Sequence, residues 1–226
     1  MAPRTFCNRV ALLALVFSSL AVTASEARAD LIVNGGFEAP FVPDGTAFVT
    51  TNSLPGWRVF GPGGVTGTGD VDVILGYWPA AEGRQSIDLV GDTGIGTGID
   101  QSFATVVGTA YVLSFQYANN VDASFAIGNV QLLGATTLLN QDVRHDGSTR
   151  ADMNYTLFST TFVANSTTTT LRFTHVNSSI PGFSGLALDA VSVVEAPQAI
   201  PEPSALTLLG LGTFGLLGYG RRRRAA

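Results

Sequence analysis

The sequence predicts an all-β protein built as an antiparallel sandwich. Polar and apolar residues alternate along many short segments, as in residues 111–117, where Tyr111, Leu113, Phe115 and Tyr117 share one face. Turn-forming residues separate these segments. No stretch of ten or more residues combines a helical 3.6-residue period with capping residues. Closely spaced strands of this kind indicate a β-sandwich, and the pattern leaves jelly-roll and immunoglobulin-like topologies open.

The first half of the domain contains five predicted strands. Residues 31–37 form the apolar start, and residues 57–60 follow a Pro-Gly pair. Residues 71–75 alternate valine and isoleucine with an acidic residue. Residues 85–89 and 99–103 lie on either side of a loop rich in glycine and threonine, so each is bounded by turn residues.

The second half contains five more, and they are richer in aromatic and β-branched residues. Residues 111–117 and 171–176 show the clearest alternation. Residues 124–133 and 155–163 are flanked by polar turns. Residues 186–194 form the last predicted strand, before a segment that contains three prolines.

The N-terminus has the features of a secretory signal peptide. Arg4 and Arg9 give a positive start, residues 10–22 are uncharged and mostly apolar, and Ala27-Arg28-Ala29 is a small-x-small cleavage site. We therefore assign residues 1–29 to a signal helix that is removed on export, and residues 30–196 to the β-sandwich domain.

Composition excludes several classes of function. Residues 30–196 carry five arginines, fifteen carboxylates and no lysine, a formal charge of about −10, so nucleic acid is not an expected partner. The single cysteine, Cys7, lies in the signal peptide, which leaves the domain without disulfide or thiol chemistry. His145 and His175 lack metal-ligand spacing, and His175 is expected to be a hydrogen-bonded sheet residue.

The C-terminal segment is predicted to be a short membrane span. Residues 197–204 form a linker rich in proline, and residues 205–220 contain no charge. As a helix those sixteen residues would be about 24 Å long, slightly short of a ~30 Å hydrocarbon core. The segment 205–226 ends in four cationic residues that would hold this end in the cytoplasm: Arg221, Arg222, Arg223 and Arg224.

The order of features in this tail resembles the PEP-CTERM sorting signal. Pro201, Glu202 and Pro203 precede a glycine-rich apolar segment and a terminal arginine cluster. The resemblance implies recognition by an exosortase, a membrane-embedded transpeptidase, and removal or exchange of the span. A plain membrane anchor is the alternative, and it does not account for the Pro-Glu-Pro sequence.

Several segments of the domain resemble DUF642 and the related bacterial choice-of-anchor proteins. Plant members of that family carry disulfide cysteines that this domain lacks. The start and the last strand also resemble the terminal strands of galactose-binding-like jelly rolls, which implies that fold. The segments that resemble DUF642 are residues 31–38, 54–57, 71–74, 82–89 and 99–103, and those that resemble the galactose-binding-like jelly roll are residues 31–38 and 186–193.

The resemblance to carbohydrate-binding jelly rolls implies a structural calcium site. Glu38, in the Phe-Glu pair near the start, and Asp189, in the last strand, occupy the positions that bind calcium in many of those domains. Ala190 replaces the usual second polar residue. The alternative is that both carboxylates bind only nearby backbone groups. No cofactor is required by either interpretation.

A sugar contact is expected at an aromatic side chain with polar neighbours. Trp78 is the best candidate, with Tyr77 beside it and Glu82 and Arg84 nearby, whereas Trp57 is expected to be buried in the core.

The sequence therefore predicts an exported, non-enzymatic surface or matrix protein whose domain binds extracellular polysaccharide. A purely structural protein without a small ligand is the alternative. A glycoside-active enzyme is a third, weaker hypothesis, because no pair of carboxylates can be assigned to a cleft.

Overall fold

The computed structural model describes residues 28–197, and within them all regular structure except one short 3-10 turn, η1 (Pro62–Gly64), is β-strand. The predicted signal peptide and the predicted C-terminal span lie outside the described residues, and the described part contains no helix long and apolar enough to cross a membrane. The described residues form eleven strands: β1 (Phe48–Thr51), β2 (Arg58–Phe60), β3 (Val71–Ile74), β4 (Ser86–Asp88), β5 (Gly98–Ala104), β6 (Ala110–Asn119), β7 (Phe125–Leu133), β8 (Thr137–Asp146), β9 (Thr156–Val163), β10 (Thr168–Ser178) and β11 (Leu186–Glu195).

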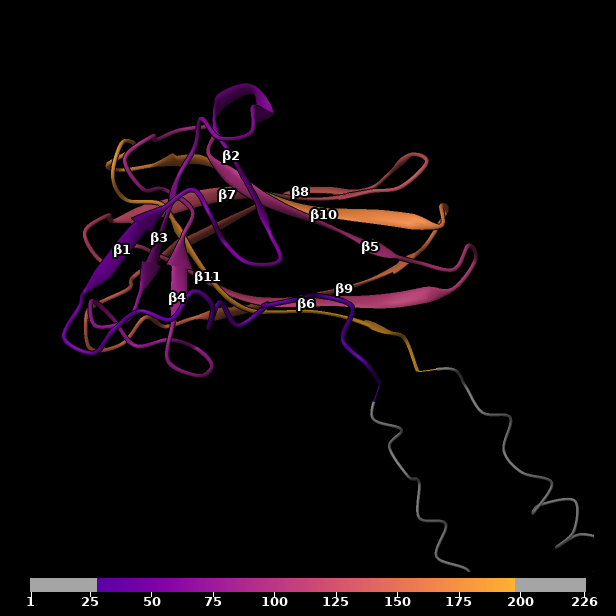
Figure 1. Ribbon diagram of the computed structural model, residues 1–226, viewed down its shortest axis with the longest axis horizontal. Coiled ribbons are helices and arrows are strands. Elements are labelled where there is room, and N and C mark those ends of the chain that lie inside the picture. The colour runs from indigo at the N-terminus through magenta and orange to yellow at the C-terminus, as the bar shows by residue number, and fades with distance from the viewer. Residues whose placement is uncertain (1–27, 198–226) are drawn as a thin grey trace, which may run out of the picture.

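The strands form two antiparallel sheets that pack face to face (Figure 1). The six-stranded sheet has the order β1-β3-β4-β11-β6-β9, and the five-stranded sheet has the order β2-β5-β10-β7-β8. Most neighbours within a sheet are not consecutive in sequence, so the chain passes repeatedly from one sheet to the other, which is how a sandwich buries both inner faces. The prediction of an all-β antiparallel sandwich is confirmed.

The main core lies between the sheets and is aromatic at its centre. The ring of Phe115, from the six-stranded sheet, meets that of Phe173, from the five-stranded sheet, edge to face with centroids 4.9 Å apart. Trp57 packs against Phe173 and Phe37, with centroid distances of 6.3 Å and 5.7 Å. Trp57 is thus a core residue, as predicted.

A second apolar cluster covers the outer face of the six-stranded sheet. It contains Ile74, Ala118 and Ala187, whose neighbours in sequence face the main core, together with Trp78 and Met153 from loops. The β3–β4 loop (75–85) therefore folds back over its own sheet.

The start of the domain departs from the predicted strand at 31–37. Leu31 donates a backbone hydrogen bond to Val193 of β11, but the chain then enters a turn in which Asn34 and Phe37 have positive φ angles. Gly35 approaches the backbone of β11 so closely that a Cβ atom would lie 1.9 Å from the carbonyl oxygen of Val191. Strands β1 and β8 were not predicted.

Candidate functional site

The outer face of the five-stranded sheet carries a polar hollow of about 330 Å³, here called the sheet-face hollow. Strands β7 and β10 supply its base, and glycines of the η1 and β4–β5 loops supply its wall. Its lining residues are Phe60, Gly63, Gly64, Gly96, Asn129, Gln131, Arg172 and Thr174.

Four polar side chains of the hollow form a square on two adjacent strands. Arg172 of β10 lies opposite Gln131 of β7, and Thr174 lies opposite Asn129. Their apolar neighbours in sequence, such as Phe173 and Val130, face the core, so alternation directs the polar set outward. Antiparallel pairing thus places the four polar groups within ~5 Å across the strands and ~7 Å along them.

An aromatic ring forms the floor at one side. Phe60 is 2% exposed and lies against Gly98 of the neighbouring strand, where a Cβ atom would be 2.6 Å from the ring. The guanidinium carbons of Arg58 and Arg172 lie 5.3 Å and 5.2 Å from the ring centroid. Both arginines therefore make cation–π contacts with the same buried ring.

Asp100 of β5 holds these two arginines in place. Arg58 donates from Nε to Asp100 Oδ1 at 2.8 Å and from Nη2 to Oδ2, and Arg172 donates from Nε and Nη2 to Oδ2 at 3.1 and 3.0 Å. The hydrogen bonds with Asp100 raise the pKa of Arg58. Because two guanidinium groups share one carboxylate, the cluster keeps one net positive charge beside the hollow.

The amide side chains are tied to the next strand, β8. Asn129 Nδ2 donates to Asn140 Oδ1 at 2.9 Å and to Asp142 Oδ1 at 2.7 Å, and Gln131 Nε2 donates weakly to Asn140 Oδ1 at 3.3 Å. Both hydrogens of the Asn129 amide are therefore used, and the group that Asn129 can offer a ligand is its carbonyl oxygen.

The hollow thus combines fixed donors, fixed acceptors and a nearby aromatic floor. The Arg172 guanidinium donates, the Asn129 carbonyl accepts, and the Thr174 hydroxyl can do either. Hydroxyl-rich ligands require this mixture, because each hydroxyl group is both a donor and an acceptor.

The structure corrects the expectation that Trp78 is an exposed sugar platform. Trp78 is 3% exposed, lies in the second apolar cluster, and donates from Nε1 to the Ser86 hydroxyl at 3.0 Å. The ring is covered because the β3–β4 loop folds over the sheet. The sequence pattern could not distinguish a tryptophan that is exposed on a loop from one that anchors the loop.

Tyr77, beside it, is half-buried and already partnered. Its hydroxyl donates to Asp122 Oδ2 at 2.5 Å, and the Arg150 guanidinium lies 3.9 Å from its ring centroid and bonds to the same hydroxyl. The hydrogen bond with Asp122 raises the pKa of Tyr77.

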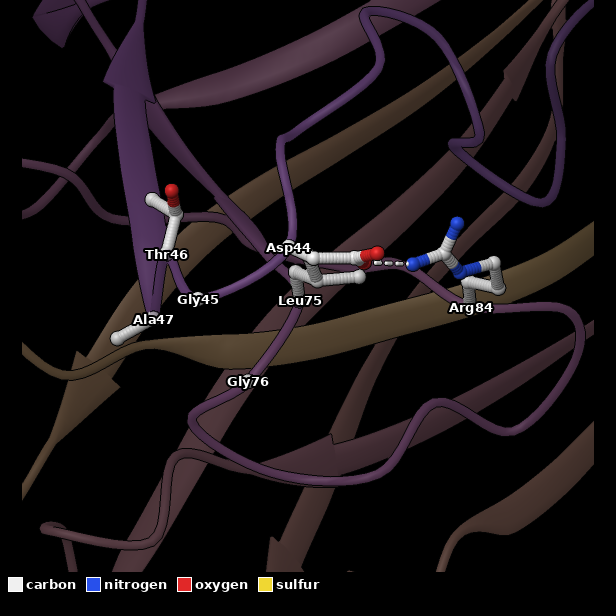
Figure 2. Close-up of a pocket in the computed structure, with 7 residues that line it drawn as sticks. All are labelled: Asp44, Gly45, Thr46, Ala47, Leu75, Gly76 and Arg84. Carbon is white, nitrogen blue, oxygen red and sulfur yellow. Dashed lines mark hydrogen bonds and ion pairs between the residues drawn. The ribbon is translucent and has the colours of Figure 1, made fainter.

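Arg84 and Glu82 lie at the exposed end of the same loop. Figure 2 shows Arg84 reaching across to Asp44 over a hollow of about 480 Å³, which is lined otherwise by small residues and Leu75. The side chains of Arg84 and Asp44 are both largely exposed. The four predicted sugar-contact residues therefore do not line one site: two are in packed or partnered positions, and two are on the surface.

Glu38 and Asp189 do converge, on the β3–β4 loop. Glu38 Oε1 accepts from the backbone amides of Arg84 and Gln85 at 2.6 and 2.9 Å, and Asp189 Oδ2 accepts from those of Ala81 and Glu82 at 2.8 and 2.9 Å. The two ends of the domain thus hold one loop.

The same two carboxylates are the predicted calcium ligands. Asp189 is fully buried, burial raises its pKa to about 7, and no arginine within residues 28–197 forms an ion pair with either carboxylate. A divalent cation would balance these charges, although in the described part of the chain no group of three or more His, Cys, Asp or Glu residues is arranged to hold a metal ion. Backbone carbonyls would have to complete the shell, and calcium stays a prediction.

The sheet-face hollow itself was not predicted. Asn129, Gln131, Arg172 and Thr174 appear in the sequence as the polar positions of alternating strands, and any half-exposed strand has such positions. Only the register that brings β7 and β10 together, and the loop that forms the wall, distinguish them.

Comparison with known proteins identifies both parts of the chain. Residues 30–194 match DUF642, described as a protein family of unknown function, and residues 199–224 match the PEP-CTERM protein-sorting motif. That motif, which includes Pro201, Glu202 and Pro203 and the arginines from Arg221, lies outside the described residues. It implies export, sorting to the cell surface and processing by an exosortase.

Three more distant likenesses are found. Halomucin of Haloquadratum walsbyi is 29% identical over 204 residues, which cover 86% of this chain and 2% of halomucin, so this chain spans a small fraction of that relative. TmCBM61, solved in complex with β-1,4-galactotriose, has a TM-score of 0.50 at 13% identity, over 74% of this chain and 99% of that one. A CBM4 structure has a TM-score of 0.47 at 17% identity, over 73% and 99%. The chain belongs to the DUF642 family and carries a PEP-CTERM sorting motif C-terminal to its β-sandwich domain.

Proposed function

We propose that this chain is a non-enzymatic surface protein whose domain binds extracellular polysaccharide in the sheet-face hollow. The observation that supports the proposal is the square of Asn129, Gln131, Arg172 and Thr174 beside the Phe60 floor. Its donors and acceptors are fixed before any ligand arrives, which lowers the entropy cost of binding. The likeness of the fold to a sugar-bound protein agrees with this proposal.

Arg172 gives the sharpest test. Arg172→Ala removes the one charged side chain that lines the hollow, while Asp100 keeps its two bonds to Arg58, so the sheet stays intact. We expect affinity for the best polysaccharide of a panel to fall at least tenfold, from a Kd in the micromolar-to-millimolar range that is roughly typical of a single weak site. Affinity electrophoresis or calorimetry measures the change.

Arg144→Ala is the matched control. Arg144 is an arginine of the same sheet that lies outside the hollow and interacts with Asp146 and Phe125. Its removal should leave affinity unchanged. A panel without any ligand, or an Arg172→Ala variant that binds as the unchanged protein does, would contradict the proposal.

Absence of catalysis is part of the same proposal. Asp100 and Asp142 each lie opposite a member of the square in the strand register. Both are already engaged by fixed donors, Asp100 by the guanidinium groups of Arg58 and Arg172 and Asp142 by the Asn129 amide, which does not favour a general-acid role. Release of reducing sugar ends from a bound polysaccharide, abolished by Asp100→Asn, would contradict it.

A further inference from the structure

The two sheets have four edge strands, and three of them are protected against pairing with another chain. Strands β1 and β2 are only four and three residues long. Strand β8 is longer but carries Asp142, Arg144 and Asp146. Short length and charge are the usual means by which proteins prevent pairing at sheet edges.

Strand β9 lacks these protections. It is eight residues long, reads TLFSTTFV, and contains no charge, proline or glycine. It pairs with β6 along one edge, and no other strand within residues 28–197 pairs with it. Leu157 and Val163 are 62% and 54% exposed, although both are apolar. In a domain of formal charge about −10, this edge is an uncharged surface on which a second copy can approach without strong repulsion.

The sequence of β9 is chemically self-complementary about Thr160. An antiparallel partner related by a twofold axis at Thr160 would place Leu157 opposite Val163 and Phe158 opposite Phe162. Ser159 would then face Thr161. Every cross-strand pair thus joins side chains of the same kind: aliphatic, aromatic or hydroxyl. Such pairs stabilise antiparallel sheets.

We propose that β9 is a self-association edge, at which two copies of this chain pair antiparallel about Thr160 and join their six-stranded sheets into one continuous sheet. This pairing explains why Leu157 and Val163 are exposed in the single chain, because Leu157 of each copy would cover Val163 of the other. The dimer would present two sheet-face hollows, which lie on the five-stranded sheets and remain free.

Cysteine cross-linking tests the register directly, because Cys7 is the only native cysteine. The full chain, expressed for export with Cys7→Ala, receives Thr160→Cys. On the twofold axis the two thiols lie within disulfide reach, and oxidation should give a covalent dimer on a non-reducing gel. Thr156→Cys is the control on the same strand. Its two copies would be about 27 Å apart, at ~3.4 Å per residue, and should not cross-link.

A second variant separates the strand edge from any association through the tail. Ser159→Lys adds a charge to an exposed position of β9 and should lower the Thr160→Cys cross-link yield at least tenfold, whereas Thr168→Lys on β10 should not. Circular dichroism melting confirms that each variant is folded. Equal cross-linking at Thr156 and Thr160, no cross-linking at Thr160, or a yield unaffected by Ser159→Lys would overturn the proposal.

Discussion

His175 is a buried side chain whose polar atoms have no partner. It is 1% exposed, and within residues 28–197 neither ring nitrogen makes a hydrogen bond. The prediction of a sheet residue holds, but the predicted hydrogen bond is absent from the described part. A buried polar group without a partner costs roughly 1–3 kcal/mol, so His175 weakens the sheet to which it belongs.

We therefore expect His175→Leu to raise the free energy of unfolding by about 1–2 kcal/mol at pH 7. Burial lowers the pKa of His175 to about 4, below its value in the unfolded chain. Protonation thus favours unfolding, so the stability present above about pH 6.5 is lost as the pH falls toward 4. The advantage of His175→Leu should grow over that interval. Urea unfolding at several pH values measures it.

His145 is the control for this prediction. It is also buried, but its Nδ1 accepts from the Asn119 backbone amide at 3.1 Å and its Nε2 donates to the Asn154 carbonyl at 2.8 Å. His145→Leu leaves those partners unsatisfied and should be destabilising. If both leucine variants lost stability to the same extent, the account of His175 would be wrong.

At the scale of elements, the alternation of polar and apolar residues predicted most strands of the sandwich, but it missed two edge strands and the turn at the start of the domain. Strands with an apolar face in the core, such as β6 and β10, are visible in the sequence because burial imposes the period of two. Strand β8 is polar along most of its length, and β1 is short, so neither shows that period clearly. Residues 31–37 are apolar because they pack at the core, and their backbone is a turn.

The candidate site was less predictable than the fold. Alternation indicates that Arg172 and Thr174 point outward, but it does not indicate which strand lies beside β10. The register with β7 depends on long-range contacts that no local pattern records. Conversely, Trp78 has the composition of a ligand contact and the position of a core residue, because its loop folds over a sheet face that the pattern treats as exposed.

The prediction at the scale of elements concerns calcium binding beside the β3–β4 loop. We expect added calcium to raise the melting temperature of the protein, because calcium would bind the folded state through Glu38 and Asp189. Glu38→Gln should remove that rise. Glutamine keeps an oxygen for the Arg84 and Gln85 amides but lacks the negative charge that calcium needs. Thermal melting with calcium and with chelator measures both effects.

Glu82→Gln is the control. Glu82 is an exposed carboxylate of the same loop, and within residues 28–197 its side chain accepts no hydrogen bond from a backbone amide. This variant should keep the calcium-dependent rise in melting temperature that Glu38→Gln loses. An unchanged protein that shows no calcium-dependent shift would mean that Glu38 and Asp189 serve the loop amides alone.

At the scale of the whole molecule, the two ends of the domain lie together. Asp30 Oδ1 accepts from the Val193 amide at 3.0 Å, and Leu31 donates to the Val193 carbonyl at 2.9 Å. Figure 1 shows both ends leaving the same side of the sandwich. The sheet-face hollow lies on the other sheet from these ends, so an attachment through the C-terminus would leave that surface accessible.

The last prediction concerns the sorting motif, which follows the domain in the sequence. If residues 205–220 span the membrane as the sequence predicts, hydrophobic transfer would hold the precursor there and the arginines from Arg221 would keep that end in the cytoplasm. Replacing Pro201, Glu202 and Pro203 by alanine leaves both forces unchanged and removes the recognised sequence. We therefore expect the variant to accumulate in the membrane fraction with residues 205–226 attached, whereas the unchanged chain loses them. Mass spectrometry of the C-terminal peptide after cell fractionation distinguishes the two. Retention of the tail in both chains would mean that it is a permanent anchor, and loss in both would mean that release does not depend on the motif.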